Sequence, residues 1–236
     1  MSAFARAVER GYDYVETDVH ATADGVVVAQ HDARLERTTD GRGAIRQLPW
    51  SAVATARVGG REPVPRLCDV LEAFPHTRFN IDVKDDAAVG PVLRVLARQR
   101  AWHRVCLASF DERRVRLLRR AGGPELLTSL GRASSTLLWL SSRTAAGAVL
   151  PRPAGAAAQL PLTRHGLRVV DRRLVRRAHR WGLEVHVWTI DDPAWMRRLL
   201  DLGVDGVITD RPDLLSAVLA ERGGQNAAAP SADTGR

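Results

Sequence analysis

The sequence predicts a TIM (β/α)8-type barrel, an α/β fold in which parallel strands alternate with helices around one core. Short apolar runs alternate with segments of helical period along most of the chain, which is the pattern of repeated βα units. The chain has 236 residues, of which 45% are hydrophobic, and a single barrel of about 250 residues suits that size. We therefore expect one barrel domain over residues 1–222.

Seven apolar runs are expected to form the parallel strands: residues 14–18, 79–84, 105–110, 126–130, 157–162, 184–189 and 206–209. Helices are expected at residues 3–10, 66–73, 89–100, 112–121, 171–181 and 193–202. The helix boundaries carry typical residues. Pro193 suits a first helical position, and Gly11, Gly182 and Gly203 suit the position just after a helix.

The segment after the first of these strands interrupts the alternation. Asp24-Gly25 between two extended stretches predicts a β-hairpin, which would fold His31 back toward the end of the strand at 14–18. Residues 33–65 are polar and rich in glycine and arginine, and we expect them to form a small inserted lobe after strand 2 of the barrel. From residue 223 the sequence has low complexity and predicts a disordered tail over 223–236.

Eight strands close such a barrel, whereas this sequence opens directly with the helical segment at 3–10 and supplies seven. We therefore expect the first β-strand to be missing. Its absence would leave two strand edges without partners.

Composition narrows the classes of partner. A net charge of +8 suits a phosphate-bearing substrate, an anionic surface or nucleic acid. The arginines recur in helical runs where they form solvated faces, and no zinc-finger or RNA-binding signature accompanies them, so we expect no nucleic-acid partner. No apolar stretch of about 18 residues occurs, which predicts a cytoplasmic protein without a transmembrane segment. The sequence contains no pattern that predicts the oligomeric state.

Glu16 and Asp18 lie two residues apart on a predicted strand, so both side chains project from the same face. Near the carboxyl end of a barrel strand that face is the mouth of the barrel, and two carboxylates crowded there repel unless a cation neutralises them. A hard divalent ion with oxygen ligands is one candidate. An ordinary acidic pair neutralised by arginine is the other.

The next barrel strand repeats this pattern, because Asn80, Asp82 and Lys84 share one face of the run at 79–84. Buried parallel strands normally read apolar on both faces, so the alternation is unusual. Lys84 is also the only lysine in the chain. Asp82 would complete an oxygen set for a metal, and Lys84 would offer a positive charge to a phosphoryl oxygen. A buried Lys–Asp ion pair remains the alternative.

Two further residues are candidates for the chemistry. His31, at the end of the hairpin, could exchange a proton with a leaving alcohol because imidazole titrates near neutral pH. Trp188, at the end of a late strand, could form an apolar wall for the substrate, although filling the core would equally explain it.

These residues carry a resemblance to a known family. The run Gly-Tyr-Asp-Tyr-Val-Glu-Thr-Asp-Val-His through Gln-His-Asp, then Asn-Ile-Asp-Val-Lys, Ala-Ser-Phe, Val-Trp-Thr-Ile and Gly-Val-Ile-Thr-Asp-Arg-Pro resembles the glycerophosphodiester phosphodiesterase family. The resemblance implies a TIM barrel, active in lipid and glycerol metabolism, that hydrolyses glycerophosphodiesters to glycerol 3-phosphate and an alcohol with Mg²⁺ or Ca²⁺.

The resemblance also implies roles for particular residues. Glu16 and Asp18 match the family's metal-binding Glu-x-Asp, and Asp82 stands where the family usually has glutamate. His31 and Lys84 match a catalytic histidine and the lysine near phosphate. Phe110 of Ala-Ser-Phe, Trp188 and Lys84 are expected to bind substrate.

The family's His-Arg-Gly strand has no counterpart, so this chain supplies one of two acid/base histidines, and we expect impaired activity. A start assigned too late would explain the missing strand. An inactive fragment or pseudoenzyme that binds phosphodiesters without turnover is the alternative.

Overall fold

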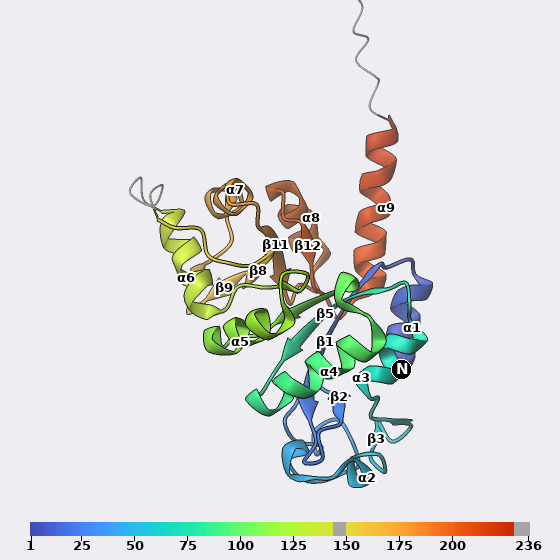
Figure 1. Ribbon diagram of the computed structural model, residues 1–236. Coiled ribbons are helices and arrows are strands. Elements are labelled where there is room, and N and C mark those ends of the chain that lie inside the picture. Colours follow the sequence, from blue (N-terminus) through green and yellow to red (C-terminus); the bar gives the residue numbers. More distant parts are fainter. Residues whose placement is uncertain (144–149, 229–236) are drawn as a thin grey trace, which may run out of the picture. The chain divides into compact units, whose positions relative to one another are not determined.

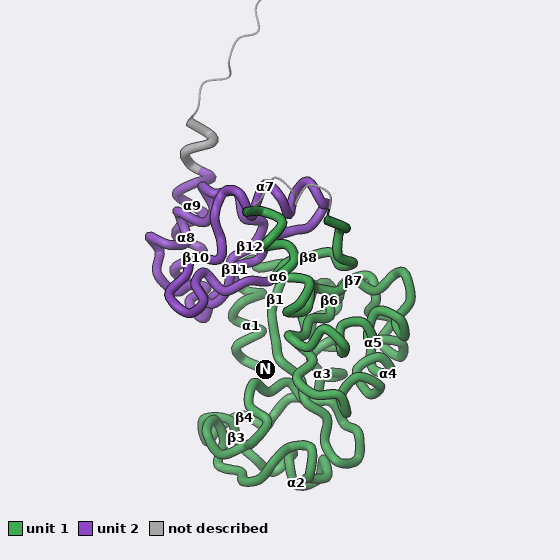
Figure 2. The backbone as a smooth tube through the Cα atoms, turned by 90° about the vertical axis from the view of Figure 1, so that its left-hand side faces the viewer, with its two compact units in different colours: residues 1–158 green, residues 159–236 purple. Residues whose placement is uncertain are grey.

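A computed structural model describes residues 1–143 and 150–228, with side chains described as far as residue 223 at the C-terminal end. The chain divides into two compact units, Met1–Ala158 and Gln159–Arg236, shown in green and purple in Figure 2.

The first unit is built on a five-stranded sheet in the order β2-β1-β5-β6-β7. The strands are β1 (Tyr14–Ala21), β2 (Val27–Ala29), β5 (Arg78–Val83), β6 (Val105–Ala108) and β7 (Leu127–Thr128). β1, β5, β6 and β7 run parallel, whereas β2 pairs antiparallel with β1. The register places Asp18 opposite Asp82 on neighbouring parallel strands, so polar side chains predicted on two separate strands meet in one row.

Helices of this unit precede, connect or follow its parallel strands. They are α1 (Ser2–Glu9), α3 (Leu67–Ala73), α4 (Val89–Gln99), α5 (Glu112–Gly122) and α6 (Arg132–Ser141), and α3, α4 and α5 lie side by side (Figure 1). Their buried side chains join those of the strands in one core around Phe79, Ile81 and Leu107. Phe4 of α1 packs its ring edge against Phe79, with 6.2 Å between the ring centroids. This burial of apolar surface holds the strands that carry the polar row.

Residues 33–65 form a small lobe with a core of its own. It contains η1 (Ile45–Gln47), α2 (Trp50–Val53), β3 (Arg57–Val58) and β4 (Glu62–Pro63). Five of its apolar side chains pack around Val28 of β2: Leu35, Ile45, Val53, Ala56 and Val64. The hairpin that leads into the lobe turns at Gly25, whose φ of +79° favours glycine.

The second unit has a three-stranded sheet in the order β12-β11-β8. Its strands are β8 (Ala157–Pro161), whose first two residues belong to the first unit, β11 (Glu184–Trp188) and β12 (Gly206–Val207). Its helices are α7 (Arg172–Arg180), α8 (Pro193–Leu202) and α9 (Pro212–Ala228). A short exposed hairpin, β9 (Thr163–Arg164) with β10 (Leu167–Arg168), precedes α7. None of the helices in the described parts of the chain is both long and apolar enough to cross a lipid bilayer.

The seven predicted strands are all present, most of them with boundaries shifted by a few residues. The α6 helix, α9 and the β9–β10 hairpin were not predicted. The tail expected at 223–236 starts inside α9, which runs to Ala228. The rest of that tail, 229–236, lies outside the described residues.

Candidate active site

Lys84 joins the two carboxylates that face each other across β1 and β5. Its Nζ atom lies 2.7 Å from Asp18 Oδ1 and 2.8 Å from Asp82 Oδ2. Both carboxylates are mostly buried, and the lysine side chain is 21% exposed. Two like charges this close destabilise each other unless a cation lies between them. The Lys–Asp ion pair that the sequence left open as an alternative is therefore present, with Asp18 as a second partner.

The carboxylates also hold the proton on this lysine. Burial, the largest single influence, acts to lower the pKa of Lys84, because removing a charge from water disfavours the ionised form. The negative charge of Asp82 and the hydrogen bonds to Asp18 and Asp82 outweigh it, so the pKa lies above its usual value. Lys84 is therefore a fixed positive charge at neutral pH, suited to holding a phosphoryl oxygen and unsuited to acting as a base.

One oxygen of this arrangement has no partner among the described residues. Asp82 Oδ1 is buried and makes no hydrogen bond there, although Oδ2 of the same carboxylate contacts Lys84. A buried acceptor without a partner costs about 1–3 kcal/mol, and such atoms in native proteins call for an explanation. A carboxylate oxygen beside a second carboxylate is the donor type that a hard divalent cation prefers, so the residues fit such an ion.

Glu16 lies on β1 two residues before Asp18, and it is opposite Asn80 of β5 in the register. Within residues 1–143 and 150–228, no three His, Cys, Asp or Glu side chains lie close enough together to hold a metal ion. The structure thus brings Asp18 and Asp82 together through Lys84. The three-carboxylate ligand set of Glu16, Asp18 and Asp82 stays a prediction.

The hairpin brings His31 near the end of β1, as its sequence indicates. The backbone nitrogen of Gln30 donates to the carbonyl oxygen of Asp18 at 2.9 Å. The His31 side chain is 68% exposed, and its Nδ1 lies 2.7 Å from Asp32 Oδ1. Arg37, and then His31, hold the pKa of the Asp32 carboxyl well below its usual range. Asp32 is thus ionised and can orient the imidazole.

A second histidine, which the sequence analysis did not select, lies deeper. His20 is 5% exposed and projects from the same face of β1 as Asp18. Its Nδ1 lies 3.0 Å from Asp85 Oδ2, and its Nε2 lies 3.3 Å from the carbonyl oxygen of His31. Burial acts to raise the pKa of Asp85, but hydrogen bonds from His20 and from the backbone of Ala88 outweigh it and leave the pKa lowered. The one sequence signal for this pair is that Asp85 directly follows Lys84, which places a further carboxylate next to the candidate site.

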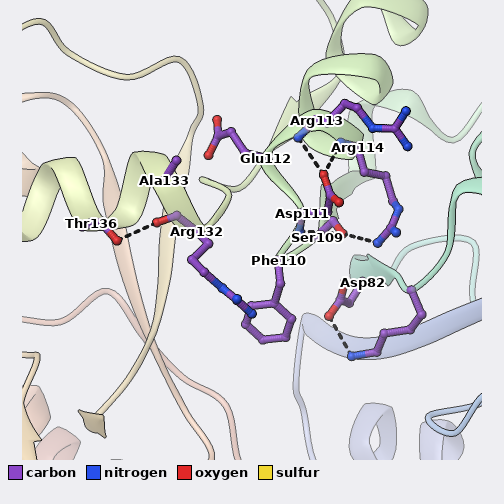
Figure 3. Close-up of a pocket in the computed structure, with 11 residues that line it drawn as sticks. Asp82, Ser109, Phe110, Asp111, Glu112, Arg113, Arg114, Arg132, Ala133 and Thr136 are labelled. Carbon is purple, nitrogen blue, oxygen red and sulfur yellow. Dashed lines mark hydrogen bonds and ion pairs between the residues drawn. The ribbon is translucent and has the colours of Figure 1, made fainter. Parts of the chain in front are cut away.

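A cavity of about 730 Å³ opens beside Lys84. Figure 3 shows residues that line it. Asp82, Lys84 and Phe110 line it together with the first turns of α5 and α6. The Lys84 ammonium lies 5.6 Å from the centroid of the Phe110 ring, and this ring is 47% exposed. A phosphate held at Lys84 would therefore have an open aromatic surface beside it for the organic part of a ligand.

Charged side chains on α5 stabilise the wall of this cavity. Arg114 donates to Asp86 Oδ1 at 2.8 Å, to the Val83 carbonyl at 3.1 Å and to Ser109 Oγ at 2.9 Å. Asp111 caps α5 by accepting from the backbone nitrogens of the two residues that follow Glu112. These bonds fix the loop after β6, which carries Phe110.

Trp188 lies at the end of β11 in the second unit. It lines a separate pocket of about 280 Å³ within that unit, together with Thr189, Asp191 and Trp195. Its expected contact with substrate stays a prediction.

Known proteins resemble this chain in sequence. Residues 1–214 match the Glycerophosphoryl diester phosphodiesterase family. The "Probable glycerophosphodiester phosphodiesterase 2" of Mycobacterium tuberculosis is 40% identical over 235 residues, covering 94% of this chain and 85% of that protein. A glycerophosphodiester phosphodiesterase of Caldanaerobacter subterraneus is 26% identical, covering 94% of this chain and 92% of its own length.

Solved structures show the same fold. The glycerophosphodiester phosphodiesterase of Agrobacterium tumefaciens is similar with a TM-score of 0.71 at 25% identity, covering 90% of each chain. An Oleispira antarctica phosphodiesterase is similar with a TM-score of 0.74 at 21% identity, covering 93% of this chain and 89% of that one. These likenesses confirm the predicted α/β barrel class.

The fold is that of the α/β barrel class, and the candidate site combines two carboxylates with one lysine. The chain belongs to the glycerophosphoryl diester phosphodiesterase family, as its sequence motifs indicated. It is accordingly a phosphoric diester hydrolase.

Proposed function

We propose that the chain hydrolyses glycerophosphodiesters to glycerol 3-phosphate and an alcohol by metal-assisted acid/base catalysis. The observation that carries this proposal is the fixed cation Lys84 between two carboxylates, one of which keeps a buried oxygen without a partner among the described residues. The Oleispira antarctica phosphodiesterase was solved in complex with the product sn-glycerol-3-phosphate, which supports the assignment of substrate class.

Lys84 would hold a non-bridging oxygen of the phosphate. Its raised pKa keeps it charged at any physiological pH, so it can stabilise the negative charge that develops as water attacks phosphorus. Phe110 would pack against the organic part of the substrate beside that phosphate. Trp188 is the predicted second apolar contact.

Glu16, Asp18 and Asp82 would hold one divalent cation, Mg²⁺ or Ca²⁺, through oxygen ligands. When bound, such an ion supplies positive charge to the phosphate and activates water. Binding would require Asp18 and Asp82 to share their oxygens between Lys84 and the ion. Oδ1 of Asp82, which has no partner among the described residues, is the oxygen that can do so without giving up a hydrogen bond there.

His31 would donate the proton that the leaving alcohol needs. Its exposed imidazole is free to approach a substrate, and Asp32 at 2.7 Å holds the ring through Nδ1, which leaves Nε2 for the reaction. A substitution at Asp32 should therefore lower the rate less than one at His31.

The proposal is tested by measuring release of glycerol 3-phosphate from glycerophosphocholine with Mg²⁺, with Ca²⁺ and with EDTA. We expect turnover with one of the metals and loss of turnover in EDTA. The variants Asp82→Asn, Lys84→Met and His31→Ala should each lower kcat by ~10²–10³. Asp69→Asn serves as a matched control because Asp69 pairs with Arg66 on the surface. Full turnover in EDTA, or unchanged rates in all three variants, would refute the mechanism.

Binding of phosphodiesters without turnover is a second candidate function. The observation that favours it concerns His20, the other imidazole near the site. Asp85 and the His31 carbonyl contact its two ring nitrogens. Of these two histidines, only His31 is then left to serve as an acid/base group. We propose that turnover is impaired for this reason, by about 10²–10⁴ relative to an enzyme with two such groups. Calorimetry that detects binding of glycerophosphocholine while no glycerol 3-phosphate is released would favour the second candidate.

A further inference from the structure

The cavity beside Lys84 is lined by four cationic and three anionic side chains, and the partners of these charges differ. Lys84 is held by Asp18 and Asp82. Arg113 and Arg114 both contact Asp86.

Arg132 is the remaining cation. In the described part of the chain its guanidinium has neither an ion pair nor a hydrogen bond. The acids of the lining are also engaged elsewhere. Asp111 accepts from the backbone of α5, and Glu112 accepts from Ser134 at its backbone nitrogen and hydroxyl, at 3.0 and 2.8 Å. The positive charge of Arg132 is thus the one in this cavity that the protein does not neutralise by direct contact within the described residues.

The backbone of Arg132 is held firmly in place. Its nitrogen donates to the carbonyl oxygen of Phe110 at 3.1 Å, which ties the start of α6 to the loop that carries the aromatic ring. Gly131 permits this approach, because a Cβ atom there would lie 2.8 Å from the Cα atom of Glu112. Figure 3 shows the Arg132 side chain extending toward the Phe110 ring, with the Glu112 carboxylate turned away from it.

Lys84, Phe110 and Arg132 together indicate the chemistry of a ligand that would fit this cavity. With a phosphate at Lys84, the adjoining alcohol would lie against the Phe110 ring, and a further group on that alcohol would face Arg132. A guanidinium binds carboxylate and phosphate oxygens with paired hydrogen bonds, whereas it repels a quaternary ammonium. We propose that Arg132 is a specificity residue, which selects glycerophosphodiesters whose alcohol carries an anionic group. This inference rests on the proposed function of the same site.

The test compares three diesters: glycerophosphoinositol 4-phosphate with an anionic alcohol, glycerophosphoinositol with a neutral one, and glycerophosphocholine with a cationic one. The wild-type chain should have its highest kcat/KM with the anionic diester. In Arg132→Gln the ratio of kcat/KM for the anionic diester to that for glycerophosphocholine should fall by about 10- to 100-fold, since charge-assisted hydrogen bonds are lost. Arg120→Gln is the matched control, because Arg120 is an exposed arginine of α5 outside the cavity lining. Its ratio should stay at the wild-type value.

An equal ratio in the wild type and in Arg132→Gln would overturn the inference while leaving the proposed function intact. Absence of turnover for all three diesters would refute the proposed function, and binding then decides the inference separately. Calorimetry in EDTA should show weaker binding of glycerophosphoinositol 4-phosphate to Arg132→Gln than to the wild type. Equal binding would overturn the selection by Arg132. Circular dichroism of each variant verifies that it is folded.

Discussion

His20 Nδ1 lies 3.0 Å from Asp85 Oδ2, and this pair joins the end of β1 to the turn that follows Lys84. The other ring nitrogen of His20 lies 3.3 Å from the His31 carbonyl, so one buried imidazole contacts both segments that carry the proposed chemistry. We therefore expect the pair to position Lys84 and His31 relative to each other.

Removing Asp85 should destabilise the protein in a pH-dependent way. The folded-state pKa of Asp85 lies below the ordinary aspartate value of about 3.9. The stability that Asp85 contributes is therefore present above that pH and is lost as the pH falls through the folded-state pKa. Asp85→Ala should lower the free energy of unfolding by about 1–3 kcal/mol at pH 7. Urea unfolding at pH 7 and pH 3 should show this difference shrinking at the lower pH. A difference that is the same at both values would contradict the assignment.

Replacing Lys84 should leave two mostly buried carboxylates without their shared cation. Removal of one partner from a buried pair typically costs about 3–5 kcal/mol, and the partial exposure of Lys84 reduces that figure. Lys84→Met should therefore be clearly less stable than the wild type. The double variant Lys84→Met with Asp82→Asn should regain part of the loss, because one repelling charge is gone. Chemical denaturation of the single and double variants measures the coupling, and additive losses would speak against the shared ion pair.

Arg104 should contribute to stability alone. It is 9% exposed and donates to the carbonyl oxygens of Leu71, Phe74 and Thr77 at 2.7, 3.0 and 3.0 Å. Arg104→Leu leaves these acceptors without their donor, at about 1 kcal/mol or more each. A loss of about 3 kcal/mol should lower Tm by roughly 6–12 °C in a chain of this size. KM measured well below the new Tm should stay unchanged, and a raised KM would show a role in the site.

Gly131→Ala should disturb the cavity through its backbone. The added Cβ would meet Glu112 Oε2 at 2.6 Å and Glu112 Cα at 2.8 Å, and the second of these atoms cannot rotate away. We expect a loss of about 1–3 kcal/mol from overpacking. Activity toward the anionic diester should fall with it, because the start of α6 shifts. Thermal melting and the substrate ratio of the variant check both parts; a variant with unchanged values would show that the close approach is dispensable.

The sequence predicts the positions of the strands because each lies in a short stretch of strand-forming residues between turn or helix signals, although most strand boundaries shift by a few residues. Asp24-Gly25 likewise predicts its hairpin, since the turn depends on the residues within it. The α6 helix escapes prediction because serines and a threonine weaken its helical pattern. Its first turn is held instead by Glu112, a residue 22 positions away from Ser134 in the chain.

The sequence predicts which residues form the candidate site better than it predicts which of them contact one another. The alternation on two strands places Asp18, Asp82 and Lys84 on shared faces, and the parallel register then brings them together. The His20–Asp85 pair depends on a separation of 65 residues, which no local pattern reveals. Arg132 is left without an ion pair among the described residues because the nearby acids bind other groups. Only the folded structure shows these contacts.

Because Lys84 is the only lysine among 236 residues, the site contains the only side-chain primary amine in the molecule. Neutral amines attack acylating reagents, and Lys84 is the one side-chain amine that can do so, although it is held in its protonated form between two carboxylates. The rate at which Lys84 acquires an acyl group, followed by mass spectrometry, therefore reports how often this arrangement opens. The chain thus contains its own single-site probe of the active centre, and no engineered label is needed.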